Sequence, residues 1–266
     1  MVSKRWGFCL GTICLLGLLF SSCNLSSLDD PIVVTDVESE FYISPWEDLR
    51  EEGRHLQFKV VSVEDKDCRN YTIANNFDLH GKNLDVSLYD IEVPDACEEG
   101  EAPAKATIDL GTLSAGVYNL SIDLKNTVFN YGRLTLTGDS YFFDLESEDG
   151  ITFLHKELLR IPNQTIWGYV SYTEEVHRNL AENFISDLSE ITSEDNLADG
   201  YYGYFQIEDG KAPKDLDGAP TAGDYFTFSF QHTGTIDDLV SLLENHRNTN
   251  GEFIEIKIWN TLGQEF

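Results

Sequence analysis

Apolar and polar residues alternate along the first half of the chain, in short runs separated by turn residues. The run HLQFKVVSV (55–63) places Leu56, Phe58 and Val60 on one side of a strand. The same alternation recurs in three further segments, 71–93, 107–124 and 133–145. Alternation of this kind, without a helical period, predicts a first domain built only of β-strands.

One of these strands carries a recognisable motif. LGTLSAGVYNLSIDL (110–124) resembles a strand of bacterial immunoglobulin-like modules, in which an L-x-x-G-x-Y-x-L run leads into the closing hairpin. The resemblance implies an immunoglobulin-like β-sandwich over residues 33–147. The tryptophan that packs on the disulfide of antibody domains has no good counterpart here, because Trp46 precedes Cys68. That departure argues against the antibody variant of the fold and leaves the sandwich as the expectation.

After residue 147 the pattern becomes mixed. Strands are expected at 165–172, 201–207, 225–230 and 253–259. A first helix is expected after Thr173, a good capping residue, because apolar residues follow at helical spacing at Val176, Leu180, Phe184 and Leu188. A second helix is expected between Thr235, which can form a capping box with Asp238, and Gly251.

The order of these elements is β-α-β-β-α-β, which predicts a ferredoxin-like α+β domain over residues 148–266. In such a domain both helices cover one face of a four-stranded sheet. The other face would be left open, so its side chains become candidates for binding.

Strand alternation places several aromatic side chains on that open face. They are Trp167, Tyr169, Tyr202, Tyr204 and Trp259, with Glu255 beside them. Trp and Tyr offer large contact areas at low entropy cost, so this platform would suit a sugar or a flat ligand. The alternative is that the same rings pack against the first domain or against a second copy of the chain.

Two stretches of the second half are similar to another family. RIPNQTIWGYVSY (160–172) and PTAGDYFTFSFQHTG (220–234) resemble gyrase-inhibitor-like effector-binding domains. The second stretch matches through Pro220, Gly223, Tyr225, His232 and Gly234. The resemblance implies a hydrophobic ligand in an aromatic pocket that holds a carboxylate, a role that would fall to Glu255. Such domains normally accompany DNA-binding modules, which the N-terminus of this chain does not suggest.

The N-terminus has the pattern of an export signal. Lys4 and Arg5 precede an apolar run from 8 to 20, which is too short to span a membrane. Two serines then precede Cys23, and the whole resembles the lipobox of bacterial lipoproteins. The resemblance implies a signal peptide at 1–22, lipidation of Cys23 and anchoring through the attached acyl chains. The alternative is an ordinary secretory signal with a coincidental cysteine.

The residues that follow the cysteine refine the expected location. The segment 23–32 is polar and ends in Asp29 and Asp30, which resembles the acidic tether of surface-exposed lipoproteins of the Bacteroidetes type. The resemblance implies an outer-membrane protein displayed at the cell surface, with the lipid as its membrane partner.

Charge and cysteine content narrow the choice of partner and compartment. The net charge of −29 repels phosphate backbones, so we expect no nucleic-acid partner. After removal of the signal peptide and lipidation of Cys23, Cys68 and Cys97 remain as an even pair. In an exported protein such a pair is expected to form a disulfide, and free thiols are the alternative in a reducing compartment.

Catalytic and metal motifs are sparse. The sequence contains no G-x-S-x-G elbow, no H-E-x-x-H pair and no P-loop. Asp209, Asp215 and Asp217 lie in one loop that could bind Ca²⁺, but their spacing matches no EF-hand, so a solvated loop is favoured. We expect no metal, no cofactor and no catalysis.

The sequence therefore predicts a non-enzymatic binding protein that recognises a glycan, a small molecule or a partner protein through its C-terminal domain. One alternative is an exported hydrolase with an interdomain site around His232 and the acidic loop. The other is a structural subunit whose open sheet face pairs copies of the chain.

Overall fold

The computed structural model describes residues 38–266. The predicted signal peptide, Cys23 and the acidic tether lie outside the described residues. Ten strands form the first sheet: β1 (Phe41–Arg50), β2 (Gly53–Cys68), β3 (Thr72–His80), β4 (Asn83–Glu92), β5 (Glu99–Gly111), β6 (Gly116–Leu124), β7 (Val128–Leu136), β8 (Ser140–Leu145), β9 (Ile151–Phe153) and β10 (Glu157–Leu159). The first sheet is continuous and has the order β10-β8-β7-β6-β4-β3-β5-β2-β1-β9.

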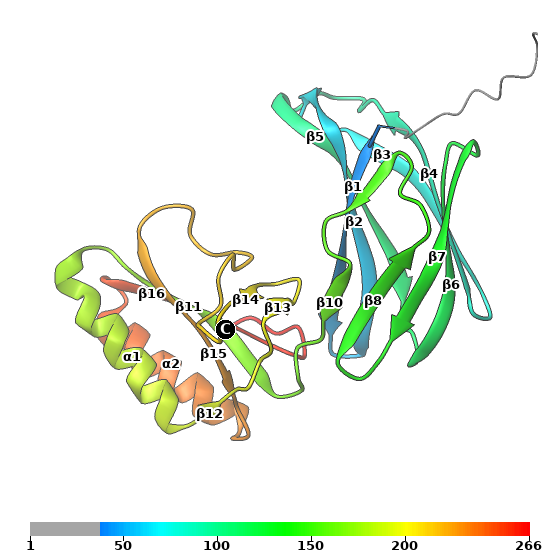
Figure 1. Cartoon of the computed structure of the whole chain (residues 1–266). Helices are drawn as coiled ribbons and strands as arrows, with labels where there is room; N and C mark the ends of the chain where they lie inside the picture. The colour runs from blue at the N-terminus through cyan, green and yellow to red at the C-terminus, as the bar shows by residue number, and fades with distance from the viewer. Residues whose placement is uncertain (1–37) are drawn as a thin grey trace, which may run out of the picture. The chain divides into compact units, whose positions relative to one another are not determined.

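This sheet curls into a half barrel (Figure 1). The register between β2 and β5 shifts at three places, and such bulges bend a strand and increase its twist. The apolar side chains of the alternating strands point to the concave face. Those that are fully buried there include Leu56, Phe58, Leu84, Val86, Leu120, Ile122, Leu134 and Phe143. The outer face carries the polar residues of each strand and faces solvent.

The predicted immunoglobulin-like sandwich is therefore wrong. The strands and their buried faces are as the alternation indicated, but one curled sheet encloses the core instead of two facing sheets. β3 and β5 join the two halves of the sheet through a single parallel pair, Thr72 with Lys105. A period of two reveals which side of a strand is buried but not which strand lies beside it. Residues 151–159, assigned to the second domain, add β9 and β10 to the first sheet.

A second sheet holds β11 (Thr165–Tyr172), β12 (Ser193–Glu194), β15 (Asp224–Gln231) and β16 (Ile254–Asn260), in the order β12-β15-β11-β16. All its neighbouring strands are antiparallel. The helices α1 (Arg178–Glu190) and α2 (Ile236–Asn250) cover one face of it (Figure 1). Their apolar sides pack on the sheet through Ala181, Phe184, Leu188, Leu239 and Leu243. A short 3-10 helix, Glu175–His177, precedes α1.

Helix α2 begins where its sequence predicts. The Thr235 hydroxyl accepts a hydrogen bond from the Asp238 N–H, and the Asp238 carboxylate accepts one from the Thr235 N–H. This reciprocal capping box satisfies two backbone donors that the first turn leaves without a helical partner. Gly251 caps the C-terminal end, with its N–H donating to the Arg247 carbonyl.

The predicted βαββαβ domain is also wrong as a fold class. The predicted strand 201–207 is absent from the second sheet, and the two-residue strand β12 lies beside β15 instead. Residues 201–207 turn back on themselves, pairing β13 (Gly200–Tyr201) with β14 (Gln206–Ile207). Gly203 permits this turn, because its φ of 82° lies in the left-handed region. Aromatic residues at alternate positions suit a strand and this hairpin equally well.

Among residues 38–266, no helix is long and apolar enough to cross a membrane.

Candidate functional site

The predicted aromatic platform is buried. Trp167 is 1% exposed, and Tyr169 and Tyr202 are each 3% exposed. The sheet face opposite the helices is covered by the segment 195–219 and by Leu49 of β1, which together form a third apolar cluster. Tyr204 and Trp259 are half-buried at the margin of this cluster. The expectation of an open aromatic face is therefore wrong, and these rings serve the core.

Contacts with β1 hold this cluster in place. The ring centroids of Trp46 and Tyr204 lie 4.4 Å apart, and Tyr204 also lies 5.3 Å from Trp167. The Tyr204 hydroxyl accepts a hydrogen bond from the Leu49 N–H at 3.2 Å. Burial raises the pKa of Tyr204 above its ordinary value. The aromatic residues chosen as a binding site thus join the first sheet to the segment that covers the second.

Glu255 lies at the edge of the same region and is exposed. The Tyr169 hydroxyl donates to Glu255 Oε1 at 3.2 Å. Desolvation, and to a smaller extent the charge of Glu255, raise the pKa of Tyr169 to about 12. The carboxylate therefore faces the solvent and not an enclosed aromatic pocket. Its proposed role toward a hydrophobic ligand stays a prediction.

A buried carboxylate in the first sheet has a structural role. The Glu47 side chain is 3% exposed and pairs with Arg54 at 2.7 Å and with Arg160 at 2.8 Å. The Tyr141 hydroxyl donates to it at 2.8 Å. Arg54 also donates to the carbonyl of Ile161. These bonds satisfy the carboxylate. They also hold the connector, residues 160–164, that leads from the first sheet into the second.

His232, the centre of the alternative hydrolase hypothesis, lies at the end of β15 and is 8% exposed. The backbone N–H of His232 donates to the carbonyl of Gln164. Burial lowers the pKa of the His232 imidazole. It borders a cavity of about 550 Å³ with Thr165, Thr261 and Asn163. Within the described residues, no hydrogen bond or shared cavity links His232 to Asp209, Asp215 or Asp217.

The predicted disulfide forms, and the acidic loop shows no metal site among residues 38–266. Cys68 and Cys97 form a disulfide across 29 positions of sequence, as predicted. In the described part of the chain, no group of three or more His, Cys, Asp or Glu side chains is arranged to hold a metal ion. Of the three loop aspartates, Asp209 pairs locally with Lys211 at 3.0 Å.

Exposed aromatic residues do occur on the outer side of the first sheet, where sequence reasoning did not place a site. Phe129 and Tyr131 are 47% and 54% exposed. Their rings are nearly parallel, with an interplanar angle of 9° and centroids 6.4 Å apart. Both belong to β7 and are two residues apart, so they project from the same side of the strand. Two aromatic residues at positions i and i+2 were the signal in the sequence that could have indicated a shared strand face.

Hydrogen-bonding side chains surround this pair. Register places Ser121 opposite Tyr131, Asp123 opposite Phe129 and Asn119 opposite Arg133. Beyond β6, the strand β4 contributes Asn83, Asp85 and Ser87 in the same way. Cross-strand partners share a face of the sheet. We call this surface, formed by the outward side chains of β4, β6 and β7, the ring face.

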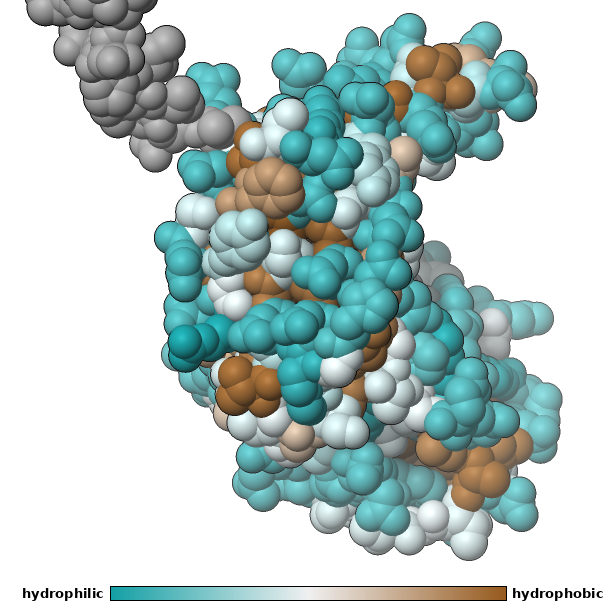
Figure 2. All heavy atoms as spheres, turned by 90° about the vertical axis from the view of Figure 1, so that its right-hand side faces the viewer, coloured by the Kyte–Doolittle hydropathy of each residue, from teal (hydrophilic) through white to brown (hydrophobic). Residues whose placement is uncertain are grey.

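Figure 2 shows this side of the first sheet. Hydrophilic side chains cover most of it, and small apolar patches lie between them. Local bonds already orient several of the polar groups. The Asn119 side-chain amide donates to Asn83 Oδ1 at 2.8 Å, and the Ser87 hydroxyl donates to the Asp123 carboxylate. The ring face therefore combines two half-exposed, nearly parallel rings with hydrogen-bonding side chains that are oriented by local bonds.

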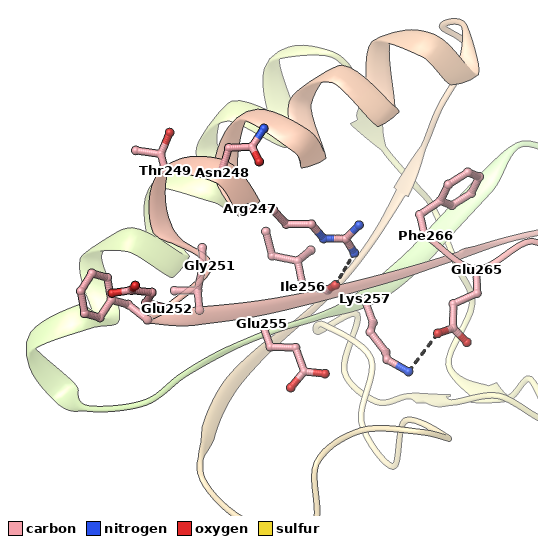
Figure 3. Close-up of a pocket in the computed structure, with 12 residues that line it drawn as sticks. Arg247, Asn248, Thr249, Gly251, Glu252, Glu255, Ile256, Lys257, Glu265 and Phe266 are labelled. Carbon is pink, nitrogen blue, oxygen red and sulfur yellow. Dashed lines mark hydrogen bonds and ion pairs between the residues drawn. The ribbon is translucent and has the colours of Figure 1, made fainter.

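A groove lies elsewhere, along the edge of the second sheet. A groove of about 990 Å³ follows β16 between the end of α2 and the C-terminal residues (Figure 3). Arg247, Glu252, Glu255, Lys257 and Glu265 line it. Lys257 is paired with Glu265 at 2.9 Å.

The chain matches no family model, and comparisons with curated proteins and with solved structures return no significant match.

Proposed function

We propose that this chain is a lipid-anchored protein of the outer membrane, displayed at the cell surface, that binds a neutral glycan chain without transforming it. The observation that carries the proposal is the pair of half-exposed, nearly parallel rings of Phe129 and Tyr131 within a frame of polar side chains. The lipid anchor rests on the export pattern and Cys23 of the sequence.

The chemistry of the ring face favours a sugar. The apolar C–H face of a pyranose lies against an aromatic ring, and its hydroxyls need hydrogen-bonding partners around the edge. Asn83, Asn119 and Ser121 offer neutral donors and acceptors beside the rings. The two ring centroids lie 6.4 Å apart, so we expect a ligand that contacts both rings to be a chain of sugars.

Charge selects among glycans. The ring face includes Asp85 and Asp123 beside Arg133, and the whole chain carries a net charge of −29. A sulfated or uronic-acid polymer would be repelled by this field. The proposed ligand is therefore an uncharged polysaccharide.

Retardation of the full chain in native gels that contain neutral polysaccharides tests the binding. We expect at least one neutral polymer to retard the protein and Tyr131→Ala to abolish the retardation. Tyr225→Ala is the matched control, because Tyr225 is a tyrosine of β15 with 39% exposure that lies outside the ring face. Equal retardation of both variants would refute the ring face as the site.

The anchor has a separate test. In cells, Cys23→Ser should move the protein from the membrane fraction to the soluble fraction, and protease added to intact cells should digest the wild-type chain. Retention of Cys23→Ser in the membrane fraction would contradict the lipid anchor. Failure of this test would leave the glycan proposal standing, because the two rest on different residues.

A further inference from the structure

The outer edge of β16 is already used by a short added strand. Ile258 and Phe266 exchange two backbone hydrogen bonds, at 3.2 and 2.9 Å. Next to them, the Asn260 N–H donates to the Gln264 carbonyl at 3.1 Å. The last residues therefore run antiparallel to β16 along its edge. This edge accepts an extended backbone as a partner.

The next part of the same edge is not occupied in this way. Backbone groups along a strand point alternately to its two sides, so Ile254 and Ile256 share the outward direction of Ile258. The Ile256 carbonyl accepts a hydrogen bond from Arg247 Nη2 at 2.8 Å. By the same alternation the N–H groups of Ile254 and Ile256 and the Ile254 carbonyl point outward, and both residues line the groove.

The groove has room for a short extended segment. It runs from the turn at Gly251 to Phe266, with the β16 edge as its floor (Figure 3). A segment lying there would continue the line of residues 264–266 and pair with Ile256 and then Ile254. Strand addition of this kind takes affinity from main-chain hydrogen bonds and specificity from the flanking side chains.

Charge defines the flanking side chains. Of the two basic groups in the groove, Lys257 is paired with Glu265 at 2.9 Å and Arg247 is directed to the Ile256 carbonyl. Glu252 and Glu255 are exposed and, among the described residues, pair with no basic group. Glu255 accepts a hydrogen bond from the Tyr169 hydroxyl but keeps its negative charge. Two carboxylates without a basic partner, on a chain of net charge −29, complement a cationic segment.

We propose that the edge of β16 between Ile254 and Lys257 binds an extended peptide segment that carries lysine or arginine, by strand addition. The backbone of the segment bonds to Ile254 and Ile256. Its basic side chains lie beside Glu252 and Glu255. This site is independent of the ring face and does not rest on the glycan proposal.

Three synthetic peptides test the proposal with the full chain. Ac-Lys-Val-Lys-Val-Lys-NH₂ is the probe, Ac-Glu-Val-Glu-Val-Glu-NH₂ reverses its charge, and an N-methylated copy of the lysine peptide removes its backbone donors. Amide hydrogen exchange at Ile254 and Ile256 is the readout. We expect the lysine peptide to slow exchange at these two residues, with little change at Ile258, and we expect neither control peptide to do so.

Variants separate recognition from folding. Glu255→Gln should weaken the lysine peptide roughly two- to fivefold, the range of an exposed ion pair. Glu244→Gln, an exposed carboxylate of α2 outside the groove, should leave binding unchanged. Ile256→Pro removes the outward N–H and should abolish protection at Ile254. If that variant does not fold, the N-methylated peptide tests the complementary hydrogen bonds, those that the peptide N–H groups donate to the carbonyls of the β16 edge.

Several results would overturn the proposal. These are an unchanged exchange rate at Ile254 and Ile256 with saturating lysine peptide, equal protection by the N-methylated or glutamate peptide, and equal affinity for Glu255→Gln and wild type. Protection that rises with protein concentration in the absence of peptide would show that a second copy occupies the edge, which also contradicts a peptide site.

Discussion

Arg160 Nε lies 2.8 Å from Oε1 of Glu47, a carboxylate whose side chain is 3% exposed. This pair joins β1 to the connector between the two sheets. A buried carboxylate between two guanidinium groups leaves uncompensated charge if one partner is removed, and this is costly.

Glu47→Gln should lower the free energy of unfolding by about 3 kcal/mol, the scale found when one partner of a buried pair is removed. Urea unfolding measures it. The matched control is Glu40→Gln, because Glu40 pairs with Lys125 at 3.0 Å where both side chains are more than two-fifths exposed. That change should cost less than about 1 kcal/mol. Equal effects of the two variants would show that the buried cluster does not hold the connector.

The hydrogen bond between Tyr204 and Leu49 predicts a smaller effect. Tyr204→Phe keeps the ring contacts with Trp46 and Trp167 but leaves the Leu49 N–H without its partner. The expected loss is about 1 kcal/mol in the free energy of unfolding. Tyr131→Phe, which removes an exposed hydroxyl, should leave stability unchanged. A neutral Tyr204→Phe would mean that this bond does not contribute to the contact with β1.

The disulfide predicts a larger effect. It closes a loop of 29 positions at one end of β2, and replacing both cysteines by alanine should cost about 3–4 kcal/mol. Reducing agent should lower the free energy of unfolding of the wild type by a similar amount, and with it the midpoint of thermal unfolding. The Cys68→Ala/Cys97→Ala variant should not respond to the same reagent. A wild-type midpoint that does not change with the reductant would contradict a stabilising disulfide.

The buried carboxyl of Asp195 is expected to make the stability of the folded chain depend on pH. Burial raises the pKa of its carboxyl, and a hydrogen bond from Ser229 only partly offsets this. The folded state therefore binds the proton more tightly than the unfolded chain. Its stability decreases as pH rises from the unfolded pKa, about 4, through the higher folded value. Asp195→Asn removes this penalty.

The midpoint of thermal unfolding of Asp195→Asn should exceed that of the wild type at pH 7, and the difference should shrink toward pH 4. Asp224→Asn, at an exposed aspartate, should show no such pattern. A difference that stays constant with pH would contradict the role of the Asp195 charge.

Local structure was largely predictable from the sequence. The alternation of Leu56, Phe58 and Val60 identified a buried strand face, and Thr235 with Asp238 identified the start of α2. These signals act between neighbours in sequence, where geometry is set by the backbone. The disulfide was predicted for a different reason, the expectation that an oxidising compartment joins an even pair of cysteines.

Long-range pairing was not predictable. The alternation of Tyr202 and Tyr204 suits an edge strand and a turn equally well, and Gly203 selects the turn. Trp167 and Tyr169 looked like an open platform because nothing in their own strand shows that residues 195–219 and Leu49 cover them. Phe129 and Tyr131 were overlooked because the strand expected at 133–145 begins after them, whereas β7 begins at Val128.

Saturation-transfer NMR on the full chain with a neutral oligosaccharide tests whether the ring face binds a glycan. With irradiation of aromatic protons, we expect transfer to the C–H protons of one face of the sugar ring. The transfer should persist in Tyr225→Ala and vanish in the Phe129→Ala/Tyr131→Ala variant. Transfer that survives in the Phe129→Ala/Tyr131→Ala variant, with the fold intact, would contradict glycan binding at the ring face.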